Sequence, residues 1–247
     1  NNVIHGNSVS SVPGGAAIWI DQKGSATTVT GNSITGSSGS SLFYITNTYS
    51  GWLNTITPTI INNNALNNDT TYWIYTGKNA GTDTVNLENN WWGTTSDVEM
   101  QVKVYDWNDD ASKGLVDYTP FLTAPDTTAP PSPPVNVAAQ TGPTTIALAW
   151  DANPESDIAG YKVHYDTDAA GYPYANSVDM GDVTSYTLSN LTTGTTYYSA
   201  ISAYDSDGNE SWVSTDTTAT TLNTQPTATS TSLATSEDTA IQVTLRG

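Results

Sequence analysis

Carboxylates gather in three short segments of this 247-residue chain, and residues of this type could hold a cation. Ca²⁺ takes about 6–8 oxygen ligands, many of them Asp and Glu carboxylates, and carboxylates brought together without a cation repel one another. We therefore expect a Ca²⁺ site. The open alternative is that these are turn acids that hydrogen-bond their own backbone. The candidate ligands are Asp126, Asp151, Glu155, Asp157, Asp205, Asp207 and Glu210.

Catalytic chemistry has weaker support in the residue pattern. The two histidines, His5 and His164, stand apart from any arranged acid or nucleophile, and a zinc site would need three or four converging ligands. A glycoside hydrolase would need two carboxylates that face each other, and no acids of the first half are evidently paired. The chain has no cysteine, which excludes thiolate chemistry. We predict no catalytic residue and leave enzyme activity open.

The charge balance narrows the class of partner. The chain has 24 acidic and 6 basic residues, a formal net charge of −18. Such a surface repels phosphate backbones, so we expect no nucleic-acid partner. No apolar run approaches the ~20 residues that cross a bilayer, so we expect no membrane insertion in this segment.

Four similar short segments in the first ninety residues each place an Asn between apolar residues. Aligned on Asn7, Asn32, Asn64 and Asn90, they lie 25, 32 and 26 residues apart. A period of this size is typical of a solenoid, and short apolar runs around Asn or Gly favour strands over helices. The sequence therefore predicts stacked β-coils with an Asn ladder at one corner.

Aromatic residues recur in a second set of apolar runs, at 17–20, 42–45 and 72–75. We expect these large side chains to fill the interior or corners of the coils. The open alternative is a sugar platform, because Trp19, Trp52 and Trp73 could present one face on one side.

A short helix is predicted after the last coil. Ser96 is the expected N-cap and Glu99 its capping-box partner, and Val98, Val102 and Tyr105 fall on one helical face. Such a helix would protect the open edge of a solenoid.

The stretch from Asn90-Trp91-Trp92-Gly93-Thr94 to residue 122 resembles the closing segment of right-handed parallel β-helix domains of secreted bacterial proteins. Many proteins of this fold are polysaccharide lyases or glycoside hydrolases. Lyase chemistry wants cationic groups, however, and here the only Arg is Arg246, while the four Lys of the first half are scattered.

Residues 123–134 are Pro-rich and predict a stiff linker that holds two domains apart. Beyond the linker, residues 146–150, 160–165 and 191–197 resemble strands and the tyrosine corner of fibronectin type III domains. The resemblance implies a sandwich with a core Trp150 and a Tyr197 hydroxyl tied to nearby backbone. It also implies that the candidate Ca²⁺ ligands meet at one pole, near the linker.

The predicted fold class is all-β: a right-handed parallel β-helix with a short capping helix, then a fibronectin type III β-sandwich. The end of the chain, Ser236 to Gly247, is similar to the opening strands of cadherin-like repeats. The predicted ranges are 1–122 for the coils and cap, 123–134 for the linker, 135–222 for the sandwich, and 223–247 for a partial cadherin-like or Ig-like domain or a donor strand.

This combination predicts a non-catalytic structural or adhesive module of a modular bacterial surface protein or filament. We expect an extracellular or cell-surface location, Ca²⁺ as the bound ion, and copies of the chain or neighbouring surface modules as partners. Polysaccharide is an open alternative as partner. The alternative function is the C-terminal portion of a secreted carbohydrate-active enzyme.

Overall fold

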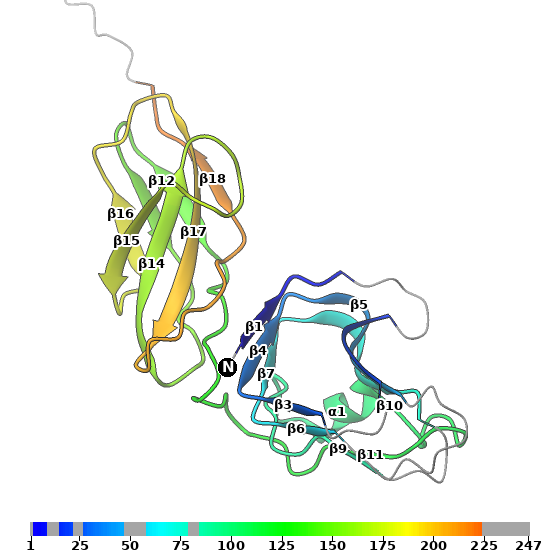
Figure 1. Cartoon of the computed structure of the whole chain (residues 1–247). Coiled ribbons are helices and arrows are strands. Elements are labelled where there is room, and N and C mark those ends of the chain that lie inside the picture. Colours follow the sequence, from blue (N-terminus) through cyan, green and yellow to red (C-terminus); the bar gives the residue numbers. More distant parts are fainter. Residues whose placement is uncertain (1, 9–14, 22–26, 47–57, 79–83, 224–247) are drawn as a thin grey trace, which may run out of the picture.

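The computed structural model describes residues 2–8, 15–21, 27–46, 58–78 and 84–223. Within these ranges the protein is all-β with one short helix, and Figure 1 shows two bodies that meet near β1 (Asn2–His5). Trp52 and nearly all of the predicted segment 223–247 lie outside the described residues.

Parallel strand pairs build the N-terminal half. The strands form sheets in the orders β1-β4-β7, β10-β8-β5-β2, β3-β6 and β11-β9. Paired residues lie about one sequence repeat apart, as Ile4 opposite Ile34 and Ile34 opposite Ala65 show. The remaining strands of this half are β2 (Ala16–Asp21), β3 (Thr28–Thr30), β4 (Asn32–Thr35), β5 (Ser38–Thr46), β6 (Thr59–Ile61), β7 (Asn64–Leu66), β8 (Asp69–Thr76), β9 (Val85–Asn86), β10 (Val104–Tyr105) and β11 (Val116–Asp117).

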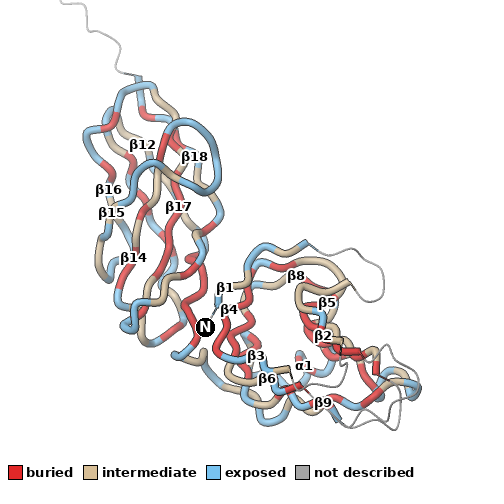
Figure 2. The backbone as a smooth tube through the Cα atoms, viewed as in Figure 1, coloured by how far each residue is buried: buried red, intermediate tan, exposed pale blue. Residues whose placement is uncertain are grey.

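Aliphatic side chains of successive repeats fill the space between these sheets. The red segments of Figure 2 mark this interior, and Ile34, Ile60 and Ile74 are completely buried in it. Each such side chain contributes about 1.5–3 kcal/mol through burial. Since each repeat supplies only a few of them, neighbouring repeats depend on one another for a core.

Asparagine side chains form the predicted ladder, but two of its residues differ from the predicted ones. Asn2 Nδ2 donates to Asn32 Oδ1 at 2.9 Å, Asn32 Nδ2 to Asn63 Oδ1 at 2.8 Å, and Asn63 Nδ2 to Asn90 Oδ1 at 2.9 Å. Asn2 and Asn63 therefore take the places that the sequence alignment gave to Asn7 and Asn64. The repeat period alone could not decide between the adjacent Asn63 and Asn64, or between Asn2 and the nearby Asn7.

The predicted helix exists as α1 (Asp97–Lys103), and its cap is confirmed: Ser96 Oγ accepts from the Glu99 backbone N–H at 3.3 Å. The predicted apolar face is wrong. Val98 is 72% and Val102 66% exposed, whereas Met100 is completely buried. The chain leaves α1 directly into β10, which pairs with β8, so the packing of this turn is set by the strand that follows it.

The C-terminal half is an antiparallel sandwich of two sheets, in the orders β12-β13-β16 and β15-β14-β17-β18. Trp150 is 5% exposed in its core. The Tyr197 hydroxyl accepts from the Thr192 backbone N–H at 3.0 Å, which confirms the tyrosine corner. The strands are β12 (Ala138–Thr141), β13 (Ile146–Ala149), β14 (Ile158–Asp166), β15 (Asn176–Gly181), β16 (Ser185–Leu188), β17 (Thr196–Asp205) and β18 (Thr217–Thr220).

The Pro-rich segment between the halves is packed, although a free-standing spacer was expected. Residues 129–134 are all buried. On the N-terminal side, Asn64 binds the Asp126 backbone twice, with Nδ2 to the carbonyl at 2.9 Å and Oδ1 to the N–H at 2.7 Å. On the other side, the Ser132 N–H donates to Glu155 at 2.8 Å, and Asn153 donates to the Ser132 carbonyl at 2.6 Å. The segment therefore joins the two halves through hydrogen bonds of its own backbone.

A ring contact adds to this joint. His5 of β1 and Trp212 of the sandwich stack with centroids 6.2 Å apart and planes at 26°. The two halves therefore touch directly as well as through the segment between them.

Candidate functional site

Four of the seven predicted Ca²⁺ ligands lie near one another at the pole of the sandwich that faces the joint. Burial raises the pKa of Asp157, and the nearby carboxylates Asp205, Asp207 and Asp126 raise it further. Among the described residues, however, no three acidic, His or Cys side chains adopt a metal-binding arrangement. The Ca²⁺ site stays a prediction.

The other predicted ligands have protein partners. Glu155 is 4% exposed and bonded within the joint. Asp151 accepts from Asn136 Nδ2 at 2.7 Å. The carboxylate of Asp205, itself within the cluster, is occupied by its own loop, including the Asn209 N–H at 2.8 Å and Nδ2 at 2.8 Å. Turn chemistry thus accounts for part of the acidic pattern.

Glu210 and His164 belong to a polar network on the face of β14 and β17. Lys162 Nζ and Ser202 Oγ both donate to Glu210, at 2.6 Å each, and His164 Nε2 lies 2.8 Å from Ser202 Oγ. Burial would raise the pKa of Glu210, but the bonds from Lys162 and Ser202 bring it below its usual value. His164 looked isolated in the sequence because its partners, Ser202 and Glu210, are distant along the chain.

This network lacks the geometry of a catalytic triad. The Ser202 hydroxyl hydrogen is directed to the carboxylate, so His164 Nε2 donates to Ser202 instead of accepting its proton. Ser202 is 1% exposed, so a substrate could not reach its oxygen. A triad needs the acid on the far nitrogen of the imidazole and an accessible hydroxyl.

Aromatic rings also line the outer face of the parallel strands. Trp19, Tyr44, Tyr75 and Tyr105 follow one another across β2, β5, β8 and β10. Tyr75 and Tyr105 stack face to face, 4.7 Å apart at 8°. Their ring faces are therefore used against each other, which favours the role of corner filler over a sugar platform.

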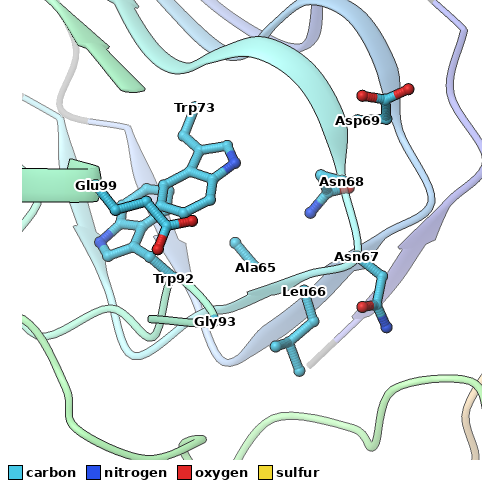
Figure 3. Close-up of a pocket in the computed structure, with 9 residues that line it drawn as sticks. All are labelled: Ala65, Leu66, Asn67, Asn68, Asp69, Trp73, Trp92, Gly93 and Glu99. Atoms are coloured by element: carbon cyan, nitrogen blue, oxygen red, sulfur yellow. The ribbon is translucent and has the colours of Figure 1, made fainter. Parts of the chain in front are cut away.

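A separate pocket of about 340 Å³ opens beside the turn that connects β7 to β8. Figure 3 shows two indoles, two carboxylates and two amides around it. Its lining residues are Ala65, Leu66, Asn67, Asn68, Asp69, Trp73, Trp92, Gly93 and Glu99.

The indoles of Trp73 and Trp92 form the apolar wall of this pocket. Their centroids lie 6.2 Å apart and their planes are nearly parallel, at 11°. Lys103 Nζ lies 5.7 Å from the Trp73 ring centre and donates to the Thr70 carbonyl at 2.7 Å. A cation of the protein itself therefore occupies one face of Trp73.

The polar rim comes from three elements, and the sequence did not show that these elements lie side by side. Asn67 sits in the turn at φ +54°, Asp69 begins β8, and Glu99 projects from α1. Glu99 was expected to return a capping-box bond to Ser96, and instead its carboxylate lines the pocket. The β-coil period could have signalled only that Asp69 and Trp73 share a strand.

The sandwich belongs to the immunoglobulin-like class by its two antiparallel sheets and tyrosine corner. Residues 130–220 match the family model of the fibronectin type III domain, so this part of the chain is a fibronectin type III domain, as the resemblance predicted. No helix of the described chain is long and apolar enough to cross a membrane.

The relatives cover only parts of the chain. It is 35% identical over 79 residues, 32% of its length, to a Kelch domain-containing protein of Saccharolobus solfataricus. It is 33% identical over 120 residues, 45% of its length, to an alpha-amylase of Niallia circulans. These stretches span 10% and 8% of the two relatives.

A solved fibronectin type III domain of human contactin 1 is 22% identical, with a TM-score of 0.37. The match covers 41% of this chain and 87% of that one.

Proposed function

We propose that this chain is a non-catalytic structural module of an extracellular, modular surface protein or filament. In this proposal the N-terminal half is a set of coils of a right-handed parallel β-helix, closed by α1 and continued by the fibronectin type III domain. Parallel pairs one repeat apart and the Asn ladder support the first part. Extracellular location agrees with the fibronectin type III domain, a module common in extracellular proteins.

The observation that carries the proposal is the packed joint. Six consecutive buried residues, 129–134, are bonded to both halves: the Ser33 hydroxyl donates to the Pro131 carbonyl at 3.4 Å, and Asn153 donates to the Ser132 carbonyl at 2.6 Å. A free linker leaves its domains to move independently, whereas buried backbone bonds must break before this joint can bend. A module of this kind transmits orientation along a stalk.

Small-angle X-ray scattering of the whole chain tests this proposal. The wild type is expected to fit one arrangement of the two halves. Asn64→Ala removes both bonds to Asp126 and should broaden the distribution of distances without unfolding either half. Asn176→Ala, an exposed position of β15 opposite Tyr165 and away from the joint, is the control. A wild type that already scatters as two freely jointed bodies would overturn the proposal.

The match to an alpha-amylase favours a second candidate, an accessory portion of a secreted carbohydrate-active enzyme. Sustained product release from neutral or acidic polysaccharides by this chain would support catalysis and contradict the leading proposal. A chain that stays inactive while tethering a catalytic domain would agree with an accessory role.

Self-association and Ca²⁺ binding belong to the same proposal. Copies of the chain or neighbouring surface modules are the proposed partners, and the four carboxylates near the joint are the proposed place for the ion. Sedimentation at increasing protein concentration, with and without Ca²⁺, tests both: a monomer under all conditions would remove self-association from the proposal.

A further inference from the structure

Three Asn-X-Ser/Thr segments occur in the chain, at Asn68, Asn190 and Asn209, and none has Pro in its middle position. This tripeptide is the acceptor sequence for N-linked glycans in secreted proteins. A chain rich in Asn and Thr contains it by chance, so the tripeptide alone does not identify a modified residue. The structure separates the three segments, because a transferase must reach both the Asn amide and the hydroxyl two residues later.

The segment at Asn68 is enclosed by the parallel strands. Asn68 Oδ1 accepts from the Ser37 backbone N–H at 2.9 Å, and its Nδ2 donates to the Ile34 carbonyl at 2.8 Å. The hydroxyl residue of this segment, Thr70, is 2% exposed, and its Oγ1 is buried. A transferase therefore cannot reach the amide and hydroxyl of this segment in the folded chain.

The segment at Asn209 is enclosed within the sandwich. Asn209 Nδ2 donates to Asp205 at 2.8 Å. Its hydroxyl residue, Ser211, is 8% exposed, and Ser211 Oγ accepts from the Ala203 N–H at 2.9 Å and donates to the Trp212 carbonyl at 2.6 Å. The hydroxyl that a transferase would have to recognise is therefore occupied by bonds of the fold.

The segment at Asn190 is open at both positions. Asn190 and Thr192 are exposed, and neither side chain makes a hydrogen bond within the described part of the chain, so modification breaks no bond of the fold. The backbone between them is held, because the Leu191 N–H donates to the Thr144 carbonyl and the Thr192 N–H to the Tyr197 hydroxyl, at 3.0 Å each. The acceptor segment is thus presented on an ordered surface turn.

This turn lies at the pole of the sandwich opposite the joint. Gly194, between Asn190 and β17, lies beside Asn223, whereas β17 ends at Asp205 near the joint. Figure 1 shows β17 running from the far pole toward the N-terminal half. A bulky glycan on this turn therefore leaves the contacts between the two halves undisturbed.

We propose that Asn190 is an N-glycosylation site of this chain. Its Nδ2 attacks the anomeric carbon of a sugar carried on a lipid diphosphate. A bond from nitrogen to that carbon forms, the bond from that carbon to the phosphate oxygen breaks, and the lipid diphosphate and one amide proton leave. The proposal rests on the extracellular location proposed above, since this modification belongs to secreted proteins.

Incubation of the purified, folded chain with an N-oligosaccharyltransferase and its lipid-diphosphate-linked glycan tests the proposal, with glycopeptide mass spectrometry as the readout. The expected product carries a glycan at Asn190. Asn190→Gln and Thr192→Ala should each abolish this modification, because one removes the attacking nitrogen and the other removes the recognised hydroxyl. Thr193→Ala, at the next exposed position, is the matched control and should be modified like the wild type.

Peptides that carry each segment show what the fold contributes. Asn68 and Asn209 should be modified more in their peptides than in the folded chain, and circular dichroism melts confirm that each variant folds. An unmodified Asn190 in the folded chain, a glycan there on Asn68 or Asn209, or equal modification of Thr192→Ala and Thr193→Ala would each overturn the proposal. A chain that accepts no glycan but scatters as one arrangement of its halves refutes the site and leaves the structural role standing.

Discussion

Amide side chains stabilise the N-terminal half at single positions. Asn63 is 1% exposed and its Nδ2 also reaches the Val29 and Ile61 carbonyls at 2.9 and 3.0 Å. The sequence predicted a ladder because Asn recurs, but assigned Asn64 to it. Asn64 instead binds Asp126, since neighbouring residues of a strand point to opposite sides.

Replacing a ladder residue should be costly. Asn63→Ala is expected to lower the free energy of unfolding by about 2–4 kcal/mol, because each buried polar group left unpaired costs about 1–3 kcal/mol. Urea unfolding measures this difference. Asn86→Ala, an exposed position, should cost under about 0.5 kcal/mol, and equal losses at both positions would contradict a structural ladder.

His164 makes the sandwich sensitive to acid. Burial lowers its pKa, and the charge of Lys162 lowers it further, against an opposing effect of Glu210. A histidine whose folded pKa lies below its unfolded value of about 6.5 stabilises the fold fully above that pH. Stability is then lost as the pH falls through the folded pKa.

Unfolding measured between pH 7 and pH 5 checks this effect. The wild type should lose stability across the interval, and His164→Gln should lose less, because Gln retains a donor for Ser202 without titrating. An identical pH dependence of the two proteins would show that His164 does not titrate differently on folding.

At the scale of elements, the short helix shows what periodicity cannot decide. Val98 and Val102 are four residues apart and so share a face, but that face is exposed. In a helix of seven residues, one inward position is enough, and Met100 fills it. The pairing of β10 with β8 sets this orientation, and that pairing is long-range information absent from the local pattern.

The exposed and buried positions of α1 should respond differently to truncation. Met100→Ala is expected to cost about 2–5 kcal/mol, as buried Met-to-Ala changes do. Val98→Ala and Val102→Ala should each stay within about 0.5 kcal/mol. Denaturant unfolding distinguishes them, and a large effect at Val98 would mean that α1 packs by its other face.

At the scale of the whole molecule, the sequence predicted features built from residues close together in the chain. It did not predict the contacts between the two halves. The spacing from Leu191 to Tyr197 predicted the tyrosine corner, because that motif is built from neighbours in sequence. The joint was missed, because nothing near Ser132 indicates that Glu155 will accept its N–H. The pocket beside the β7–β8 turn was missed for the same reason, since its rim comes from separate elements.

The acidic group at the joint gives a test of the predicted ion. In chelator, Asp157→Asn should raise the melting temperature, because it removes a carboxylate crowded by Asp205, Asp207 and Asp126. If Ca²⁺ binds there, adding it should raise the melting temperature of the wild type more than that of the variant. Indifference of the wild type to both Ca²⁺ and chelator would rule out a structural ion at this place.

The ladder also bears on chemical ageing. Asparagine deamidates when the next backbone nitrogen attacks the side-chain carbonyl and ammonia leaves. In Asn32 and Asn63 the amide oxygen and nitrogen are both held between successive repeats, and the residues that follow, Ser33 and Asn64, lie in paired strands. The attack therefore requires the strand pairing to open first. The same bonds that align the repeats thus delay their covalent decay.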